Sequence, residues 1–134
     1  MKPESVAIRK HEYGLSDTTL FILWRTAVKT KWGNKCAICG GYGPSETHHI
    51  IKRRYKLLRF DWQNGLPVHA GECHERANLE APRLIPEWQY KYLCKRQRII
   101  FKQYLLSEGI TENEWRQRVK EELKEVINGN NWEP

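Results

Sequence analysis

Long apolar segments are missing from this sequence. The first residues contain no apolar stretch of about 7 to 15 residues behind their basic side chains, as a secretory signal would need. No later run approaches the roughly 18 uncharged apolar residues of a membrane-spanning helix. The sequence therefore predicts a soluble, cytoplasmic protein.

Internal repeats and low-complexity linkers are also absent. The chain has 134 residues, and its six tryptophans and scattered aliphatic residues suffice for a single apolar core. We therefore expect one domain of the α+β class. Its predicted segments are a flexible arm over 1–15, a packing helix over 16–34, an irregular core over 35–82 and two helices within 83–134.

Helical periodicity is confined to three stretches. In the first, 18–32, the apolar residues recur at helical spacing after the capping candidate Ser16. The second follows Pro86 and carries one apolar stripe as far as Gly109, where a single helix should stop. The third starts at Thr111, whose spacing to Glu114 predicts a capping box.

Cysteine is scarce, with four residues in the chain. Cys36 and Cys39 are two residues apart, a spacing that lets two thiolates meet one ion, and His69 and Cys73 could complete a tetrahedral site. The segment around them is too irregular to be held by apolar burial alone, so we predict a structural zinc ion on these four residues. Metal-free thiols with His69 on the surface are the alternative. Cys94 lies on the apolar stripe of the second helix and is expected to be a buried thiol.

Acidic residues are outnumbered by basic ones, 16 against 23, which gives a formal net charge of +7. A polyanionic partner such as DNA fits this balance, although charge alone says nothing about chemistry. Five cations fall within eight residues, and we predict that they contact DNA: Lys52, Arg53, Arg54, Lys56 and Arg59. A second basic cluster fits a solvated face as well as it fits a DNA contact, and consists of Lys91, Lys95, Arg96, Arg98 and Lys102.

Two adjacent histidines, His48 and His49, fall in a short extended piece predicted for 46–51, and a second such piece is predicted for 65–68. Successive side chains of a strand point to opposite faces, so the two histidines are expected to do different work. Further along, Asn64 precedes a glycine, and His74 and Asn78 would share one face of a helix.

These elements together resemble the HNH endonuclease family. The resemblance consists of Cys36-Ala-Ile-Cys39, His48-His49-Ile50, Asn64 and Cys73-His74, in that order, and covers about forty residues. It implies a ββα-metal (His-Me finger) core with a structural zinc, flanked by one N-terminal helix and two C-terminal helices.

The resemblance also implies a role for each residue. His48 and His74 would bind a catalytic divalent ion (Mg²⁺, Mn²⁺, Ni²⁺ or Zn²⁺), with Asn78 as a candidate third ligand. His49 would be the general base that activates water, and Asn64 would hold the loop behind that base. The implied activity is hydrolysis of DNA phosphodiester bonds.

The partner implied is DNA, with branched or nicked DNA among the candidate substrates. The short, basic chain favours a bacteriophage enzyme acting in the host cytoplasm, as a homodimer or within a larger phage assembly. The competing interpretation is a non-catalytic zinc-scaffolded module that binds DNA or a protein. That interpretation leaves the histidine pair unexplained.

Overall fold

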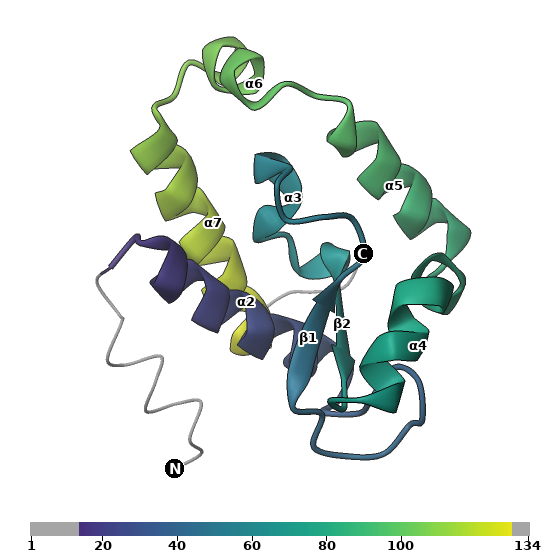
Figure 1. Cartoon of the computed structure of the whole chain (residues 1–134). Helices are drawn as coiled ribbons and strands as arrows, with labels where there is room; N and C mark the ends of the chain where they lie inside the picture. Colours follow the sequence, from purple (N-terminus) through teal and green to yellow (C-terminus); the bar gives the residue numbers. More distant parts are fainter. Residues whose placement is uncertain (1–13, 130–134) are drawn as a thin grey trace.

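The computed structural model describes residues 14–129. Its helices surround one small antiparallel sheet (Figure 1), so the predicted α+β class is confirmed. The arm predicted for 1–15 lies, apart from its last two residues, outside the described residues. The elements follow in this order: α2 (Asp17–Lys31), β1 (Glu46–His49), α3 (Lys56–Arg59), η1 (Trp62–Asn64), β2 (Gly65–Val68), α4 (Glu72–Glu80), η2 (Ala81–Leu84), α5 (Glu87–Gln97), α6 (Phe101–Glu108) and α7 (Glu112–Ile127).

Strands β1 and β2 pair with His49 opposite Gly65. Helix α2 packs on one face of this sheet and α4 on the other (Figure 1). A Cβ atom on Gly65 would lie 2.5 Å from Val28 Cγ2 and 2.8 Å from Trp24 Cζ2, closer than packed atoms approach. The backbone of Gly65 is extended, with φ −134°, and any residue could adopt it. Glycine is therefore required here by the close approach of α2 to the strand and not by the backbone conformation. Strand β1 ends two residues earlier than predicted.

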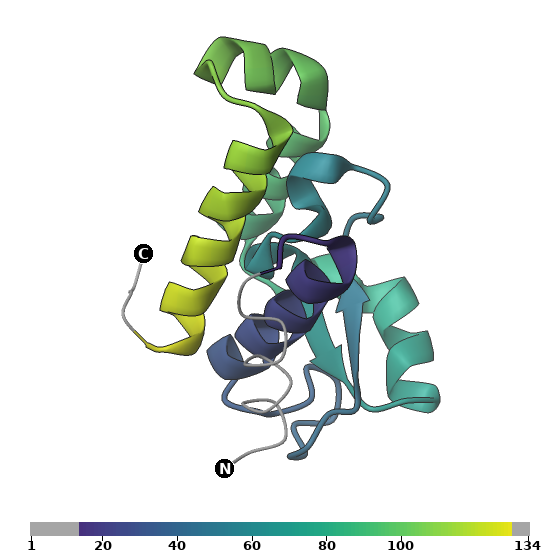
Figure 2. The same cartoon turned by 90° about the vertical axis from the view of Figure 1, so that its left-hand side faces the viewer.

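Helix α2 forms where the apolar spacing predicted it. The Ser16 side chain caps it by accepting a hydrogen bond of 3.2 Å from the backbone N–H of Thr19, and Gly33 follows its end with φ +63°. Leu20, Leu23, Trp24, Ala27 and Val28 form its buried face. Much of that face packs against α7, which Figure 2 shows beside α2.

The stretch after Pro86 forms two helices, α5 and α6, so residues 83–129 contain three α-helices and the prediction of two was wrong. The chain leaves the helical conformation at Ile100, whose φ of −77° and ψ of 122° are extended. This break lets α6 fold back, and the Phe101 ring meets the Trp115 ring edge-on at 4.7 Å between centroids. A tertiary contact therefore overrides a continuous apolar stripe.

Helix α7 begins at the predicted capping box, in which Thr111 and Glu114 each bond the other's backbone. It also holds the start of the described chain. Lys120 Nζ donates to the carbonyl of Gly14 at 3.0 Å, and Arg116 Nη1 donates to the carbonyl of Leu15 at 2.9 Å.

Among residues 14–129, none of the helices combines the length and apolarity that crossing a membrane requires.

Candidate metal centre and histidine cluster

The turn after α2 presents two sulfur atoms to the same point. Cys36 Sγ accepts hydrogen bonds from the backbone N–H groups of Ile38 and Cys39 at 3.4 and 3.5 Å, and Cys39 Sγ accepts one from Gly41 at 3.4 Å. Burial raises the pKa of the Cys36 thiol, but the hydrogen bonds outweigh it and lower this pKa to about 6. The backbone therefore favours a thiolate, the form that binds zinc.

The His69 ring is oriented by the same turn. Its Nε2 lies 3.0 Å from the carbonyl oxygen of Tyr42, and because a carbonyl can only accept, Nε2 must carry the proton. The lone pair is then on Nδ1, which lies 3.3 Å from Cys39 Sγ. A carbonyl that fixes the tautomer of a histidine in this way is common around zinc ligands.

The four predicted zinc ligands converge. The ligand atoms of Cys36, Cys39, His69 and Cys73 all lie within 4.8 Å of one another. No other group of three or more His, Cys, Asp or Glu side chains within residues 14–129 is gathered in this way. Three sulfur atoms and one imidazole suit tetrahedral zinc, so the cluster could hold a structural zinc ion as predicted. Cys94 packs against the apolar cluster around the sheet and takes no part in this group.

Strand β1 directs its two histidines to opposite faces, as its period requires. His48 meets His74 on α4, with ring centroids 5.3 Å apart. His49 stacks on Trp24 of α2, with centroids 4.0 Å apart and planes 12° from parallel. The two rings therefore lie in different environments, on opposite faces of the strand, and the different roles of the two histidines stay a prediction.

On the α4 side, His48 Nδ1 lies 3.4 Å from His74 Nε2. Two nitrogens that bind one tetrahedral ion through bonds of 2.0–2.1 Å are about 3.4 Å apart. His74 Nδ1 donates to Glu46 Oε1 at 2.5 Å, and this bond leaves the His74 lone pair on Nε2, facing His48. The pair could therefore share a divalent ion.

Glu46 is a residue that the sequence reasoning missed. It precedes His48 by two residues in β1, so both side chains lie on the same face of the strand. The signal was therefore present, as a carboxylate at the strand period from a candidate ligand. Asn78 lies exposed one turn beyond His74 on α4, and its role as a third ligand stays a prediction.

On the α2 side, the His49 ring is fixed in one tautomer. Its Nε2 lies 3.0 Å from the carbonyl oxygen of Arg59, so Nε2 carries the proton and Nδ1 keeps the lone pair. Burial is the main cause that lowers the pKa of His49 to about 4, and the charges of Arg53 and Arg25 lower it further. The ring is neutral near pH 7, with one basic nitrogen available.

Asn64 is fully buried and ties the segment after β1 to η1. Its Oδ1 accepts from the backbone N–H of Ile51 at 2.7 Å, and its Nδ2 donates to the carbonyls of Ile51 and Leu58 at 2.8 and 3.1 Å. The held segment leads to Arg59, whose carbonyl oxygen bonds His49. Asn64 therefore holds the segment from Ile51 to Leu58, which precedes the carbonyl that binds His49.

Replacing Asn64 should destabilise the protein. Asn64→Ala removes the partner of the Ile51 N–H and of the Ile51 carbonyl, at about 1–3 kcal/mol each, whereas the Leu58 carbonyl keeps its hydrogen bond from Asp61. We therefore expect a loss of roughly 3 kcal/mol in urea unfolding of the zinc-loaded protein. Asn64→Asp is the matched variant of equal size. Its second carboxylate oxygen faces two carbonyl oxygens, so its stability should fall by a similar amount. A loss below about 1 kcal/mol in both variants would contradict this role.

The predicted DNA-binding cations divide into two groups. Lys52, Arg53 and Arg54 have exposed side chains. Lys56 forms an ion pair with Glu112 at 3.8 Å, and Arg59 donates to the Arg53 carbonyl at 2.9 Å and lies 3.7 Å from Asp17. The last two are therefore engaged within the protein, and DNA contact by all five stays a prediction.

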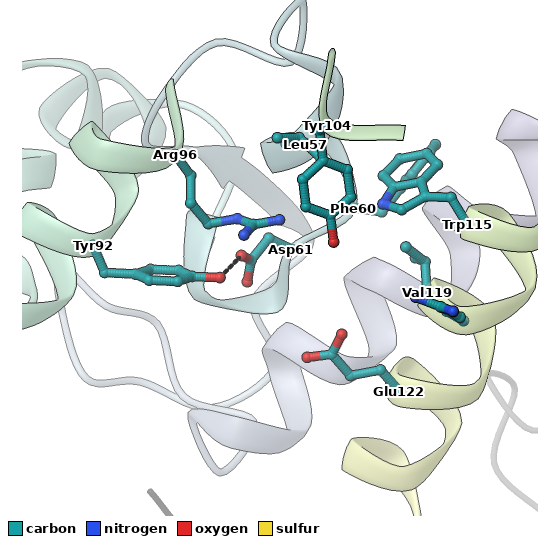
Figure 3. A pocket seen from close by; sticks show the side chains of 10 residues that line it. Leu57, Phe60, Asp61, Tyr92, Arg96, Tyr104, Trp115, Val119 and Glu122 are labelled. Carbon is teal, nitrogen blue, oxygen red and sulfur yellow. Dashed lines mark hydrogen bonds between the residues drawn. The ribbon is translucent and has the colours of Figure 1, made fainter. Parts of the chain in front are cut away.

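The second basic cluster does not form one solvated face, because Arg96 points inward. Its guanidinium lies between Tyr92 and Tyr104, with its carbon 5.7 and 5.6 Å from the two ring centroids. It lines a pocket of about 220 Å³, together with Asp61 and Glu122 (Figure 3). No histidine lines this pocket.

Asp61 connects the pocket to the His49 ring. Its carboxylate accepts from the Tyr92 hydroxyl at 2.6 Å (Figure 3), and its backbone carbonyl accepts from Trp24 Nε1 at 2.7 Å. The Trp24 ring stacks on His49. Tyr92 on α5 is therefore connected, through Asp61 and Trp24, to the ring that holds His49 in place.

Comparison with known proteins adds no family to this description: no protein-family model, curated protein or solved structure matches the chain.

Proposed function

We propose that this protein is a metal-dependent DNA endonuclease of the HNH type. One observation supports it most directly: the two adjacent histidines of β1 face opposite sides of the sheet and have different partners there. His48 and His74 pair their nitrogens on one face, while the bond of His49 Nε2 to the Arg59 carbonyl leaves the lone pair of that ring on Nδ1 on the other face. A ββα-metal nuclease needs both features at one strand, and a purely structural zinc module needs neither.

The ion would be held by His48 and His74, with Asn78 and water as further candidate ligands. Glu46 would fix the His74 ring from behind, because its carboxylate binds the opposite nitrogen. When bound, a divalent ion stabilises the charge that develops on the phosphate and on the leaving 3′ oxygen.

The protein's own contribution to the chemistry is His49. Its Nδ1 takes a proton from water, the water oxygen forms a bond to phosphorus, and the bond from phosphorus to the 3′ oxygen breaks. The 3′ oxygen is then protonated from solvent, which gives 5′-phosphate and 3′-hydroxyl ends. The Arg59 carbonyl and the Trp24 ring hold the imidazole in place during this transfer.

The cysteine cluster would be the scaffold of this site. The backbone N–H of Ala37, between Cys36 and Cys39, donates to the carbonyl of Pro67 on β2 at 2.8 Å. Cys73 immediately precedes His74 on α4. A zinc ion on the cluster would therefore set the position of α4 against the sheet, and with it the spacing between the two metal-binding histidines.

The first test is cleavage of supercoiled plasmid and of a branched DNA junction, with Mg²⁺, Mn²⁺, Ni²⁺ or Zn²⁺ added. The wild type should nick or cut at least one of these substrates. The His48→Ala/His74→Ala variant should lose about a hundredfold or more of this rate, because the ion is no longer held. Its zinc content should remain one per chain, since the cysteine cluster is untouched.

The opposite result has a definite meaning. A folded, zinc-loaded wild type that cleaves neither DNA with any of these ions, yet binds DNA in a salt-sensitive way, is a zinc-scaffolded binding module. The cysteine cluster by itself is compatible with such a module, so cleavage decides between the two functions.

A further inference from the structure

Two arginines from different elements meet at one aromatic ring beside His49. Arg25 belongs to α2 and Arg53 to the segment after β1. Their guanidinium carbons lie 5.9 and 6.0 Å from the centroid of the Phe21 ring. That ring in turn meets His49 edge-on at 5.9 Å. The arrangement places two fixed positive charges next to the proposed base.

Neither charge is compensated within the described part of the protein. Among residues 14–129, no carboxylate forms an ion pair with Arg25 or Arg53, and both side chains are exposed. Arg59 and Arg116, in contrast, share Asp17. Two positive charges at one ring without a partner carboxylate make this position favourable for an anion.

We infer that Arg25 and Arg53 form a phosphate clamp, with Phe21 as its platform, that holds the backbone of the nucleic-acid strand at His49. This inference rests on the proposed function, which supplies the role of His49. It adds a residue from α2, a helix whose sequence predicted packing alone. The guanidinium group suits the task, because its planar donors bind two phosphate oxygens at once.

The clamp can be tested by binding alone. A fluorescein-labelled DNA duplex is titrated with the zinc-loaded protein, without added divalent ion, over a series of salt concentrations. Arg25→Ala and Arg53→Ala should each weaken binding about tenfold at low salt. Each should also lower the slope of log K against log salt by about 1, as loss of one phosphate contact requires.

Arg83→Ala is the matched control. Arg83 is exposed in η2, which directly follows α4, and α4 lies on the face of the sheet opposite α2 (Figure 1). Its loss changes the net charge by the same amount. It should leave the slope unchanged and the affinity within about twofold. Arg25→Lys should keep the slope and lose part of the affinity, since the charge stays and the paired donors go.

Two outcomes separate the clamp from the nuclease. If Arg25→Ala matches Arg83→Ala in affinity and slope while the wild type cuts DNA, the clamp is overturned and the nuclease stands. If the clamp variants lose affinity and slope but the wild type cuts no DNA, the clamp stands and the proposed nuclease fails.

Discussion

Replacing Cys36 with alanine will abolish zinc binding and unfold the core between α2 and η2. Structural zinc contributes about 10–16 kcal/mol in zinc-finger peptides near pH 7, as much as the whole stability of an ordinary domain. Apart from the metal, the turn from Lys35 to Tyr42 is held by one bridge between those two residues and by a few backbone hydrogen bonds, such as that from Ala37 to Pro67. Loss of the metal should therefore release β1, β2 and α4 together.

Cys94→Ala is the matched control for this experiment. It also removes one partly buried thiol, but Cys94 is outside the four-residue cluster. This variant should keep one zinc per chain and lose about 1 kcal/mol of stability at most. Metal content by mass spectrometry and thermal unfolding by circular dichroism measure both effects. Wild-type zinc content and melting temperature in Cys36→Ala would refute the assignment of the cluster.

Replacing His49 is expected to have the largest effect on activity. Removal of a general base costs about 10²- to 10⁴-fold in rate, so His49→Ala should reduce DNA cleavage roughly a thousandfold. Zinc content and metal-free DNA binding should stay at wild-type levels, because His49 belongs to neither the zinc cluster nor the clamp.

His49→Gln separates the chemical role from packing. The glutamine amide can still donate to the Arg59 carbonyl and occupy much of the space beside Trp24, but it has no basic nitrogen. We expect it to be as inactive as His49→Ala and more stable in thermal unfolding. Retention of more than about a tenth of wild-type cleavage in His49→Gln would show that another group activates the water.

Local sequence signals accounted for much of the fold. Ser16, Gly33 and Thr111 mark helix ends. The position of such an end depends on which nearby residue can cap the unpaired backbone groups, so these ends could be predicted from the sequence. The four residues of the cluster that could hold zinc were also predictable, because two cysteines at close spacing, followed by a histidine and a third cysteine in an irregular segment, are typical of a zinc site. The division between His48 and His49 followed from the period of a strand.

What the local pattern could not decide were contacts made across the fold. The apolar stripe after Pro86 is consistent with one long helix, and only the packing of Phe101 on Trp115 explains why the chain breaks at Ile100. Nothing in the sequence of the basic run over 52–59 distinguishes one cation from another, because the run contains no acidic residue. The ion pairs of Lys56 and Arg59 that divide it are formed with acids on α7 and α2.

By itself, the sequence determined the helix limits set by caps and glycines, because these depend on neighbours within a few residues. It also determined the residue types of the histidine pair and of the cluster that could hold zinc, because their spacings are typical of such sites. Only the tertiary structure decided that Glu46 orients His74, that Trp24 and the Arg59 carbonyl fix His49, and that Arg25 and Arg53 both lie against the Phe21 ring. Each of these contacts joins segments distant in the chain or depends on the exact side of the sheet that a residue faces. Their geometry exists only once α2 and α4 have packed on the two faces of the strands.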